Sequence, residues 1–274
     1  MSLINEIYET DDIKTVIDRA LSNIEIIEHD ETIGISNILN FKAVHKGFIS
    51  PTTRMKYSSH SMATYSMRTT DYFYLFAEFI KKYNIKSKDA LVTNITAFLN
   101  QYLGVDRFDC DQRDYIFFDI PMQTTQTDEE LFKKLEQNEI GDLKGRGVAM
   151  CTERAAIAQN LLSLFGFKSY FVVGCVNNNS KEEAHAFNIV RGKDNYFLLD
   201  YSLPEEYYLN DNKCYIPFKR PIPFDKIDGV LNGGIVLHFD IYKTINENNN
   251  LSKELVGKRD YVIGKFELNK DKSK

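Results

Sequence analysis

The feature that most constrains this chain is a change of periodicity that begins at residue 151. Residues 151–165 carry apolar side chains three and four positions apart, the spacing of an amphipathic helix, and Gly166 follows as a stop. Three strand-like runs come next, at 168–176, 185–190 and 195–200, separated by turn-forming residues. One helix followed by a meander of strands predicts an α+β fold, in which the helix packs on an antiparallel sheet.

The residues before this unit have a different pattern. The aromatic-rich run 71–80 and the segment from Ser87 to Leu103 both have helical spacing, whereas residues 50–70 are rich in Ser and Thr, contain Pro51 and are predicted to be irregular. We therefore expect a mainly helical N-terminal region, residues 1–85, packed on a catalytic core, residues 86–270. We also expect the aromatic run to be mostly buried.

Charge and composition narrow the possible partners. The net charge of −5 gives no reason to expect a nucleic-acid surface, and no stretch has the roughly 20 consecutive apolar residues that cross a membrane. The first nine residues lack the apolar core of a secretory signal, so we expect a cytoplasmic protein with no membrane and no nucleic-acid partner. In that reducing compartment the irregularly spaced cysteines should be free thiols, namely Cys110, Cys151, Cys175 and Cys214.

Three residues within the helix-and-strand unit form a candidate catalytic triad. Cys151 begins the helix after a glycine-bearing loop, His185 lies in the second strand, and Asp200 ends the third. A helix N-terminus favours a thiolate, and a neighbouring imidazole can take the thiol proton and return it to a leaving group. Adjacent antiparallel strands can place His185 beside Asp200, whose carboxylate would then orient the imidazole.

The same segments resemble the transglutaminase-like superfamily of papain-like cysteine enzymes. That family shows a Gly-x-Cys helix start, a Leu-Leu-x-x-x-Gly run, a His-Ala-aromatic-Asn strand and an Asp-x-Thr/Ser ending. The matching segments here are Gly147–Ala155, Leu161–Gly174, Ala184–Asn188 and Leu199–Ser202. The resemblance implies a transglutaminase-like core in which Cys151 is the nucleophile, His185 the base and Asp200 the orienting group.

This resemblance implies an enzyme that forms a thioester on Cys151 and resolves it with water or an amine. The expected activity is thus that of a protease, a deamidase or a transglutaminase, acting on a peptide, a protein or a small amide. No cofactor and no metal are expected, and His29, His45 and His60 show no metal-ligand spacing. The oligomeric state stays open.

Some positions depart from the family pattern. Gly147 lies four residues before Cys151, where the family places a glycine two before, and Phe187 stands where many members carry Trp. The oxyanion hole would combine the Cys151 N–H with an upstream side chain that the motif does not locate. The candidates are Asn94, Gln101, Tyr102 and Gln123.

Other interpretations remain open. An arylamine N-acetyltransferase-like enzyme also uses Cys, His and Asp, but its Arg-Gly-Gly-x-Cys loop is not reproduced here, and a catalytically silent binding protein could keep the same fold. His238 and Asp240, two residues apart, could pair on one strand face as an alternative base. Glu153 is expected to stabilise the helix start, and Arg154 to lie on a solvated helix face.

Overall fold

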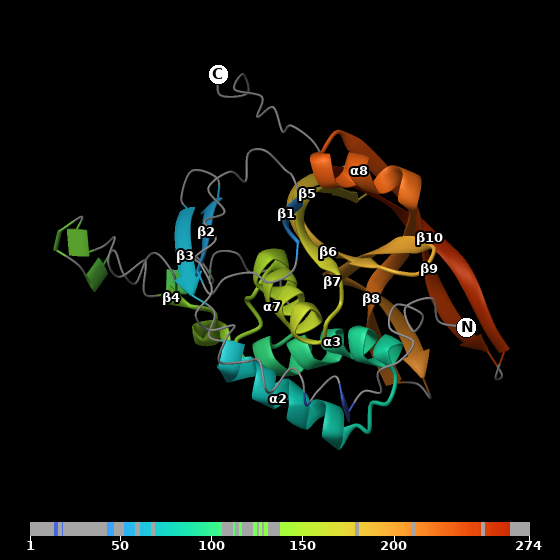
Figure 1. Ribbon diagram of the computed structural model, residues 1–274, viewed down its shortest axis with the longest axis horizontal. Coiled ribbons are helices and arrows are strands. Elements are labelled where there is room, and N and C mark those ends of the chain that lie inside the picture. Colours follow the sequence, from blue (N-terminus) through green and yellow to red (C-terminus); the bar gives the residue numbers. More distant parts are fainter. Residues whose placement is uncertain are drawn as a thin grey trace.

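The longer helices gather on one side of a large sheet in this protein, which gives an α+β fold (Figure 1). The computed structural model describes residues 69–105, 138–178, 181–209, 212–247 and 250–263, with shorter pieces between 14 and 66 and between 112 and 130. The main helices are α2 (Thr69–Lys82), α3 (Lys88–Leu103) and α7 (Cys151–Leu164).

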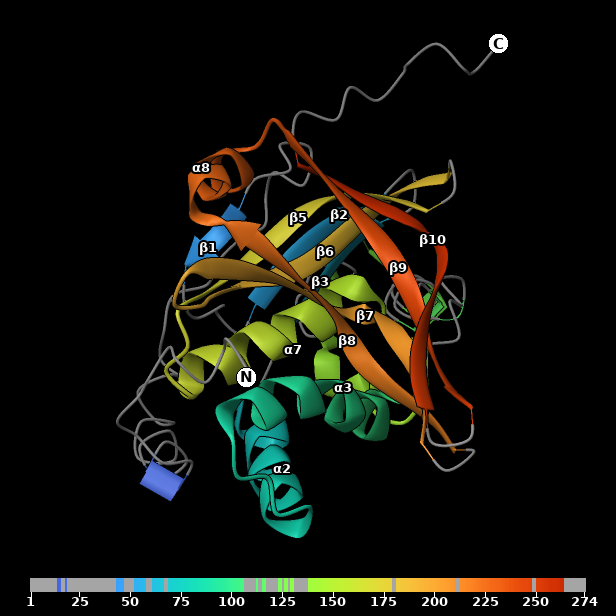
Figure 2. The same cartoon turned by 90° about the vertical axis from the view of Figure 1, so that its right-hand side faces the viewer.

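The large sheet has seven strands and closes on itself. Its strands run in the order β1-β5-β10-β9-β7-β6, β6 also pairs with β5, and β8 pairs with β7. The longer pairings are antiparallel, and β7 meets β9 in parallel at Tyr207 and Thr244. Figure 2 shows the curled sheet with α8 (Phe224–Asn232) at one end. The strands are β1 (Ala43–Lys46), β5 (Ser169–Asn178), β6 (Lys181–Arg191), β7 (Asn195–Leu209), β8 (Asn212–Pro223), β9 (Ile235–Glu247) and β10 (Asn250–Ile263).

Helix α7 lies at the centre of the fold, between the sheet and helices α2 and α3 (Figures 1 and 2). One apolar cluster fills the space around α7, and a second, including Phe187, Phe218 and Tyr261, fills the inside of the closed sheet. The amphipathic pattern predicted a solvent-exposed polar face for α7, but its polar residues Glu153 and Arg154 are buried as well. Packing on both sides covers the face that the sequence pattern assigned to solvent.

The aromatic-rich run forms helix α2 as predicted, and one face of it is buried. Phe76 and Phe79 are buried, and the Phe76 ring lies 5.7 Å from that of Phe165, just after α7. Tyr74 and Leu75 on the other face are exposed, so the expectation of a mostly buried run holds for one face only. Helix α2 shares its apolar cluster with α3 and α7; the boundary at residue 85 stays a prediction.

One expectation about the N-terminal region is wrong. Residues 50–70, predicted to be irregular, contain strands β2 (Thr52–Tyr57) and β3 (Ser61–Ser66). These two strands pair with each other, and β3 also pairs with β4 (Asn138–Glu139), which gives a three-stranded sheet. The described part of residues 1–85 therefore contains strands as well as helix α2, and the mainly helical character of the whole region stays a prediction. The Thr and Tyr residues here favour strands. Pro51 precedes the first residue of β2, so its lack of an N–H donor does not interrupt the pairing of that strand.

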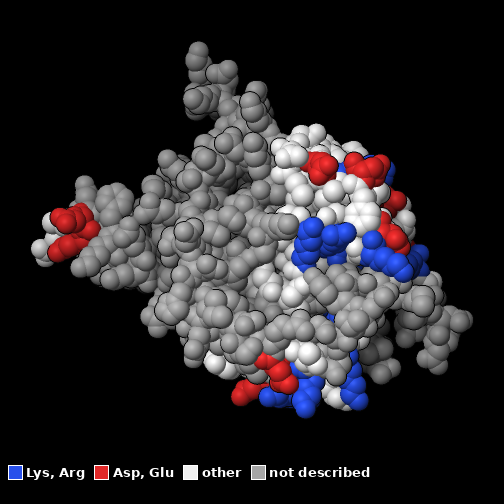
Figure 3. Space-filling model, in the orientation of Figure 1, with Lys and Arg blue, Asp and Glu red and all other residues white. Residues whose placement is uncertain are grey.

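The surface in Figure 3 carries both signs of charge. Acidic side chains lie over α8, which contains Asp225 and Asp228, and basic side chains lie nearby on the same face. Among the described residues, helices that could cross a membrane are not found.

Candidate active site

The loop that leads to Cys151 is fixed against the end of helix α3. The N–H of Gly145 donates to the Tyr102 carbonyl at 2.9 Å, and the N–H of Gly147 donates to the Leu103 carbonyl at 2.7 Å. Gly104 has a φ of +89°, and a Cβ atom there would lie 2.6 Å from the Gly147 nitrogen. Only glycine fits at position 104, because both the backbone angle and the close approach exclude a side chain.

Arg154 joins the same loop to α3 from the helix side. Its Nε donates to the Ala149 carbonyl at 3.1 Å, Nη1 to Asn100 Oδ1 at 3.0 Å, and Nη2 to the Gly104 carbonyl at 2.6 Å. The Arg154 side chain is 1 % exposed, so the expectation of a solvated helix face is wrong. Buried Arg154 instead fixes the segment immediately before the thiol.

Cys151 is the first residue of α7, as the sequence predicts. The Glu153 carboxylate accepts the Met150 N–H at 2.8 Å and so stabilises the helix start, which confirms its structural interpretation. The Cys151 sulfur lies 3.8 Å from the Thr152 hydroxyl. Because Cys151 is in the first turn of α7, its side chain lies at the positive end of the helix dipole, which favours a thiolate.

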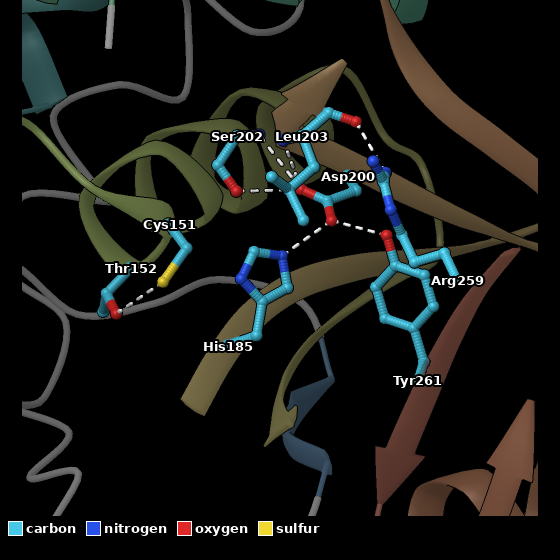
Figure 4. Close-up of polar contacts among 8 residues, drawn as sticks. All are labelled: Cys151, Thr152, His185, Asp200, Ser202, Leu203, Arg259 and Tyr261. Atoms are coloured by element: carbon cyan, nitrogen blue, oxygen red, sulfur yellow. Dashed lines mark hydrogen bonds and ion pairs between the residues drawn. The ribbon is translucent and has the colours of Figure 1, made fainter. Parts of the chain in front are cut away.

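His185 and Asp200 meet on neighbouring strands β6 and β7. His185 Nε2 lies 2.6 Å from Asp200 Oδ2, and both side chains are buried. Figure 4 shows the other ring nitrogen of His185 facing the Cys151 sulfur. The structure thus brings the three residues of the predicted triad together, in the order thiol, imidazole and carboxylate.

Asp200 is held by its own strand on one oxygen and by a distant strand on the other. Oδ1 accepts hydrogen bonds from the Ser202 N–H at 3.0 Å, the Ser202 hydroxyl at 2.8 Å and the Leu203 N–H at 3.0 Å. Oδ2 accepts the Tyr261 hydroxyl at 2.6 Å. The sequence placed Asp200 at a strand end, but β7 continues to Leu209; only its pairing with β8 is interrupted, between Asp200 and Glu205.

The electrostatics favour a thiolate–imidazolium pair. Burial raises the pKa of Cys151, but hydrogen bonding and charge from His185, with a hydrogen bond from the Ala186 backbone, outweigh burial and leave that pKa below its ordinary value. Burial lowers the pKa of His185, yet the charge and hydrogen bond of Asp200 raise it to about 10. Although burial opposes ionisation of Asp200, the charge of His185 holds its pKa well below the usual range. At neutral pH, His185 is therefore protonated.

Two residues of β10 belong to the site and were missed by the sequence analysis. Tyr261 donates to Asp200, and Arg259 donates to the Leu203 carbonyl at 2.9 Å while its charge lowers the pKa of Asp200. Both lie in an ordinary strand pattern, where an aromatic residue usually indicates core packing. Only the closure of the sheet places them beside Asp200.

The alternative base takes a different partner from the one expected. His238 Nδ1 lies 2.9 Å from Asp260 Oδ1, whereas Asp240 Oδ2 accepts the Tyr242 hydroxyl at 3.5 Å. The His238 side chain is 74 % exposed on β9. A surface ion pair of this kind contributes little to stability and does not activate a buried thiol.

The four candidates for the oxyanion hole have other places in the structure. Asn94 donates to the Ala90 carbonyl at 2.7 Å, and Gln123 is exposed. Gln101 and Tyr102 line a cavity of about 530 Å³ between α2 and α3, together with described residues of both helices. The side-chain donor of an oxyanion hole is thus not assigned, and the Cys151 N–H at the helix start keeps that role as a prediction.

The remaining cysteines and histidines fall into two groups. Cys175 is a buried free thiol, and burial raises its pKa to about 12. The side chains of Cys110, Cys214, His29, His45 and His60 lie outside the described residues. Groups of three or more His, Cys, Asp or Glu side chains that could bind a metal do not occur in the described part of the chain.

Comparison with known proteins gave no relatives. No protein-family model matches the sequence, and no curated protein matches it. The geometry of the site is therefore the basis for a proposal about its function.

Proposed function

We propose that this protein is a cysteine-dependent acyl-transfer or amide-hydrolysing enzyme that uses Cys151, His185 and Asp200. The observation that carries the proposal is the Asp200–His185 hydrogen bond of 2.6 Å beside a thiol at a helix N-terminus. The lowered pKa of Cys151 and the raised pKa of His185 support it, because together they describe a nucleophile ready at neutral pH.

The proposed reaction has two halves. The Cys151 thiolate attacks the carbonyl carbon of an amide, and the imidazolium of His185 gives its proton to the leaving amine, which yields a thioester on Cys151. Neutral His185 then takes a proton from water or from an amine as either one attacks the thioester. The carbon–sulfur bond breaks, the acid or new amide leaves, and the Cys151 thiolate and the His185 imidazolium are restored. Asp200 stabilises the imidazolium in both halves and fixes the orientation of its ring.

We also propose a transglutaminase-like core for residues 86–270, made of α7 and the strands that follow it. The order of a Cys-bearing helix, a His-bearing strand and an Asp-bearing strand supports this proposal. A peptide, a protein or a small amide is the proposed substrate. The cytoplasm is the proposed location, since a thiolate enzyme is preserved in a reducing compartment.

Selective alkylation of Cys151 tests the proposal. Iodoacetamide at about pH 6 should alkylate Cys151 far faster than Cys175, because the Cys175 thiol is buried, its pKa is raised to about 12, and it is protonated at that pH. Peptide mass spectrometry measures both rates in one sample. His185→Ala should move the alkylation profile of Cys151 toward that of an ordinary thiol. Equal rates for the two cysteines in the native protein would contradict the proposal.

A second experiment separates an enzyme from a silent relative. An activated ester such as p-nitrophenyl acetate should transfer its acetyl group to Cys151, and the acetylated peptide should be detected after quenching in acid. Cys151→Ser is the matched control, in which the thioester cannot form. A reactive thiol that accepts no acyl group would favour the silent binding protein.

A further inference from the structure

Asp200 Oδ2 receives two strong hydrogen bonds from different strands. His185 Nε2 of β6 and the Tyr261 hydroxyl of β10 both lie 2.6 Å from this single oxygen (Figure 4). Hydrogen bonds to a carboxylate share its negative charge, so each donor weakens the hold of the oxygen on the other. The phenol proton of Tyr261 therefore competes with His185 for the same charge.

The architecture places Tyr261 there with little freedom to move. Its ring is fully buried, packs edge-on against Phe187 with centroids 5.0 Å apart, and lies 6.1 Å from the His185 ring. Strand β5 lies between β6 and β10, with Gly174 opposite His185, and a Cβ atom on Gly174 would lie 2.5 Å from the Val262 carbonyl. The missing side chain lets β10 approach β5 closely enough to bring Tyr261 to Asp200.

We propose that Tyr261 is a positioning residue of the site, whose hydroxyl sets how strongly Asp200 holds the His185 imidazolium and so sets the pH range of the Cys151 thiolate. This inference rests on the proposed function and adds a regulating group to it. Tyr261 does not touch the thiol and acts through Asp200 and His185.

The ionisable groups around the triad fix the expected direction. The groups that act on Asp200 are His185 of β6 and Tyr261 and Arg259 of β10. The groups that act on Cys151 are His185 and Glu153. Without the Tyr261 hydroxyl, Oδ2 keeps more charge and holds the imidazolium proton more tightly. Because the charge of the imidazolium is then neutralised more fully by Asp200, it stabilises the thiolate less. The pKa of His185 and the pKa of Cys151 should therefore both rise.

Tyr261→Phe tests the proposal, with Tyr201→Phe as the matched control. Tyr201 is equally buried and adjoins Asp200 in the chain, but its hydroxyl donates to the Val92 carbonyl at 3.3 Å and does not contact Asp200. In acid, the alkylation rate of Cys151 falls as the thiolate is protonated. In Tyr261→Phe the pH of this acid limb should rise by about half a pH unit to one unit, so at any pH below it the rate should be about three- to tenfold lower than in the native protein. Tyr201→Phe should leave the limb in place.

A histidine titration makes the test independent of thiol reactivity. Ring nitrogen NMR of ¹⁵N-histidine-labelled protein, with His185 assigned through His185→Ala, should show the pKa of His185 higher in Tyr261→Phe than in the native protein. Tyr261→3-fluorotyrosine, a stronger donor of the same shape, should shift it in the opposite direction and also covers the case in which Tyr261→Phe fails to fold.

The outcomes separate the two proposals. An unchanged His185 titration in the Tyr261 variants, or equal shifts in Tyr261→Phe and Tyr201→Phe, would overturn the role of Tyr261. Shifts in both directions as stated would support it. A native Cys151 no more reactive than Cys175 would overturn the proposed function, while the histidine titration still decides whether Tyr261 controls Asp200 and His185.

Discussion

Replacement of Arg154 by Met should destabilise the protein strongly, although the side chain carries a charge and belongs to a helix. Its guanidinium donates three hydrogen bonds to the Ala149 and Gly104 carbonyls and to Asn100 Oδ1, and the side chain is 1 % exposed. Met fills the space of the aliphatic stem but leaves three acceptors without these donors, one on buried Ala149 and two on the half-buried residues Asn100 and Gly104. At about 1 kcal/mol for each acceptor, the free energy of unfolding should fall by about 3 kcal/mol.

Part of this loss is offset, because the folded protein no longer has to desolvate a guanidinium. Urea unfolding followed by circular dichroism measures the change as a lower midpoint at an unchanged slope. Arg146→Met is the matched control: Arg146 lies in the same loop, is exposed, and should change stability by less than about 0.5 kcal/mol. A loss below about 1 kcal/mol for Arg154→Met, close to that of Arg146→Met, would refute the reasoning.

Two further predictions concern the loop and the pH dependence of stability. Gly104→Ala should cost at least about 2 kcal/mol in thermal unfolding and slow the alkylation of Cys151, because the new methyl group would meet the Gly147 backbone at a positive φ; a variant as stable as the native protein would contradict this. His185 has a folded pKa raised to about 10, so its contribution to stability should be complete below about pH 6.5 and lost as the pH rises through 10. Asp200, with its pKa depressed, should contribute above about pH 4 and lose that contribution in acid, and Asp200→Asn should remove most of both effects in urea midpoints measured across pH.

Local signals predicted the central part of the fold. Ser87 caps α3 by accepting the Ala90 N–H at 3.1 Å, and Gly166, with a φ of +78°, ends the helix that begins at Cys151. These features depend on a few neighbouring residues, so they can be recognised from the sequence alone. The same holds for the pairing of β6 with β7, which a short connection sets and which brings His185 to Asp200.

Features that depend on distant parts of the chain were not predictable in this way. The burial of Arg154 follows from α3 covering α7, and a helix pattern alone cannot show which of its faces a second helix will cover. Tyr261 reaches Asp200 across 61 residues of chain because the sheet closes. Helix α8 was also missed, since its nine residues lie between two strands and show only a short apolar pattern.

The closed sheet also imposes an order of events during synthesis. Of the elements that form the site, the thiol-bearing helix α7 leaves the ribosome first. His185 and Asp200 follow, and β10 comes last among the described strands. The pairing of β10 with β5 joins segments that are far apart in the chain, and such long-range contacts form late in folding. Until His185 docks beside it, the Cys151 thiol stays mainly protonated, and Asp200 Oδ2 lacks its second donor, Tyr261, until β10 is in place. The full set of groups that controls the Cys151 thiol is therefore assembled only when the sheet has closed.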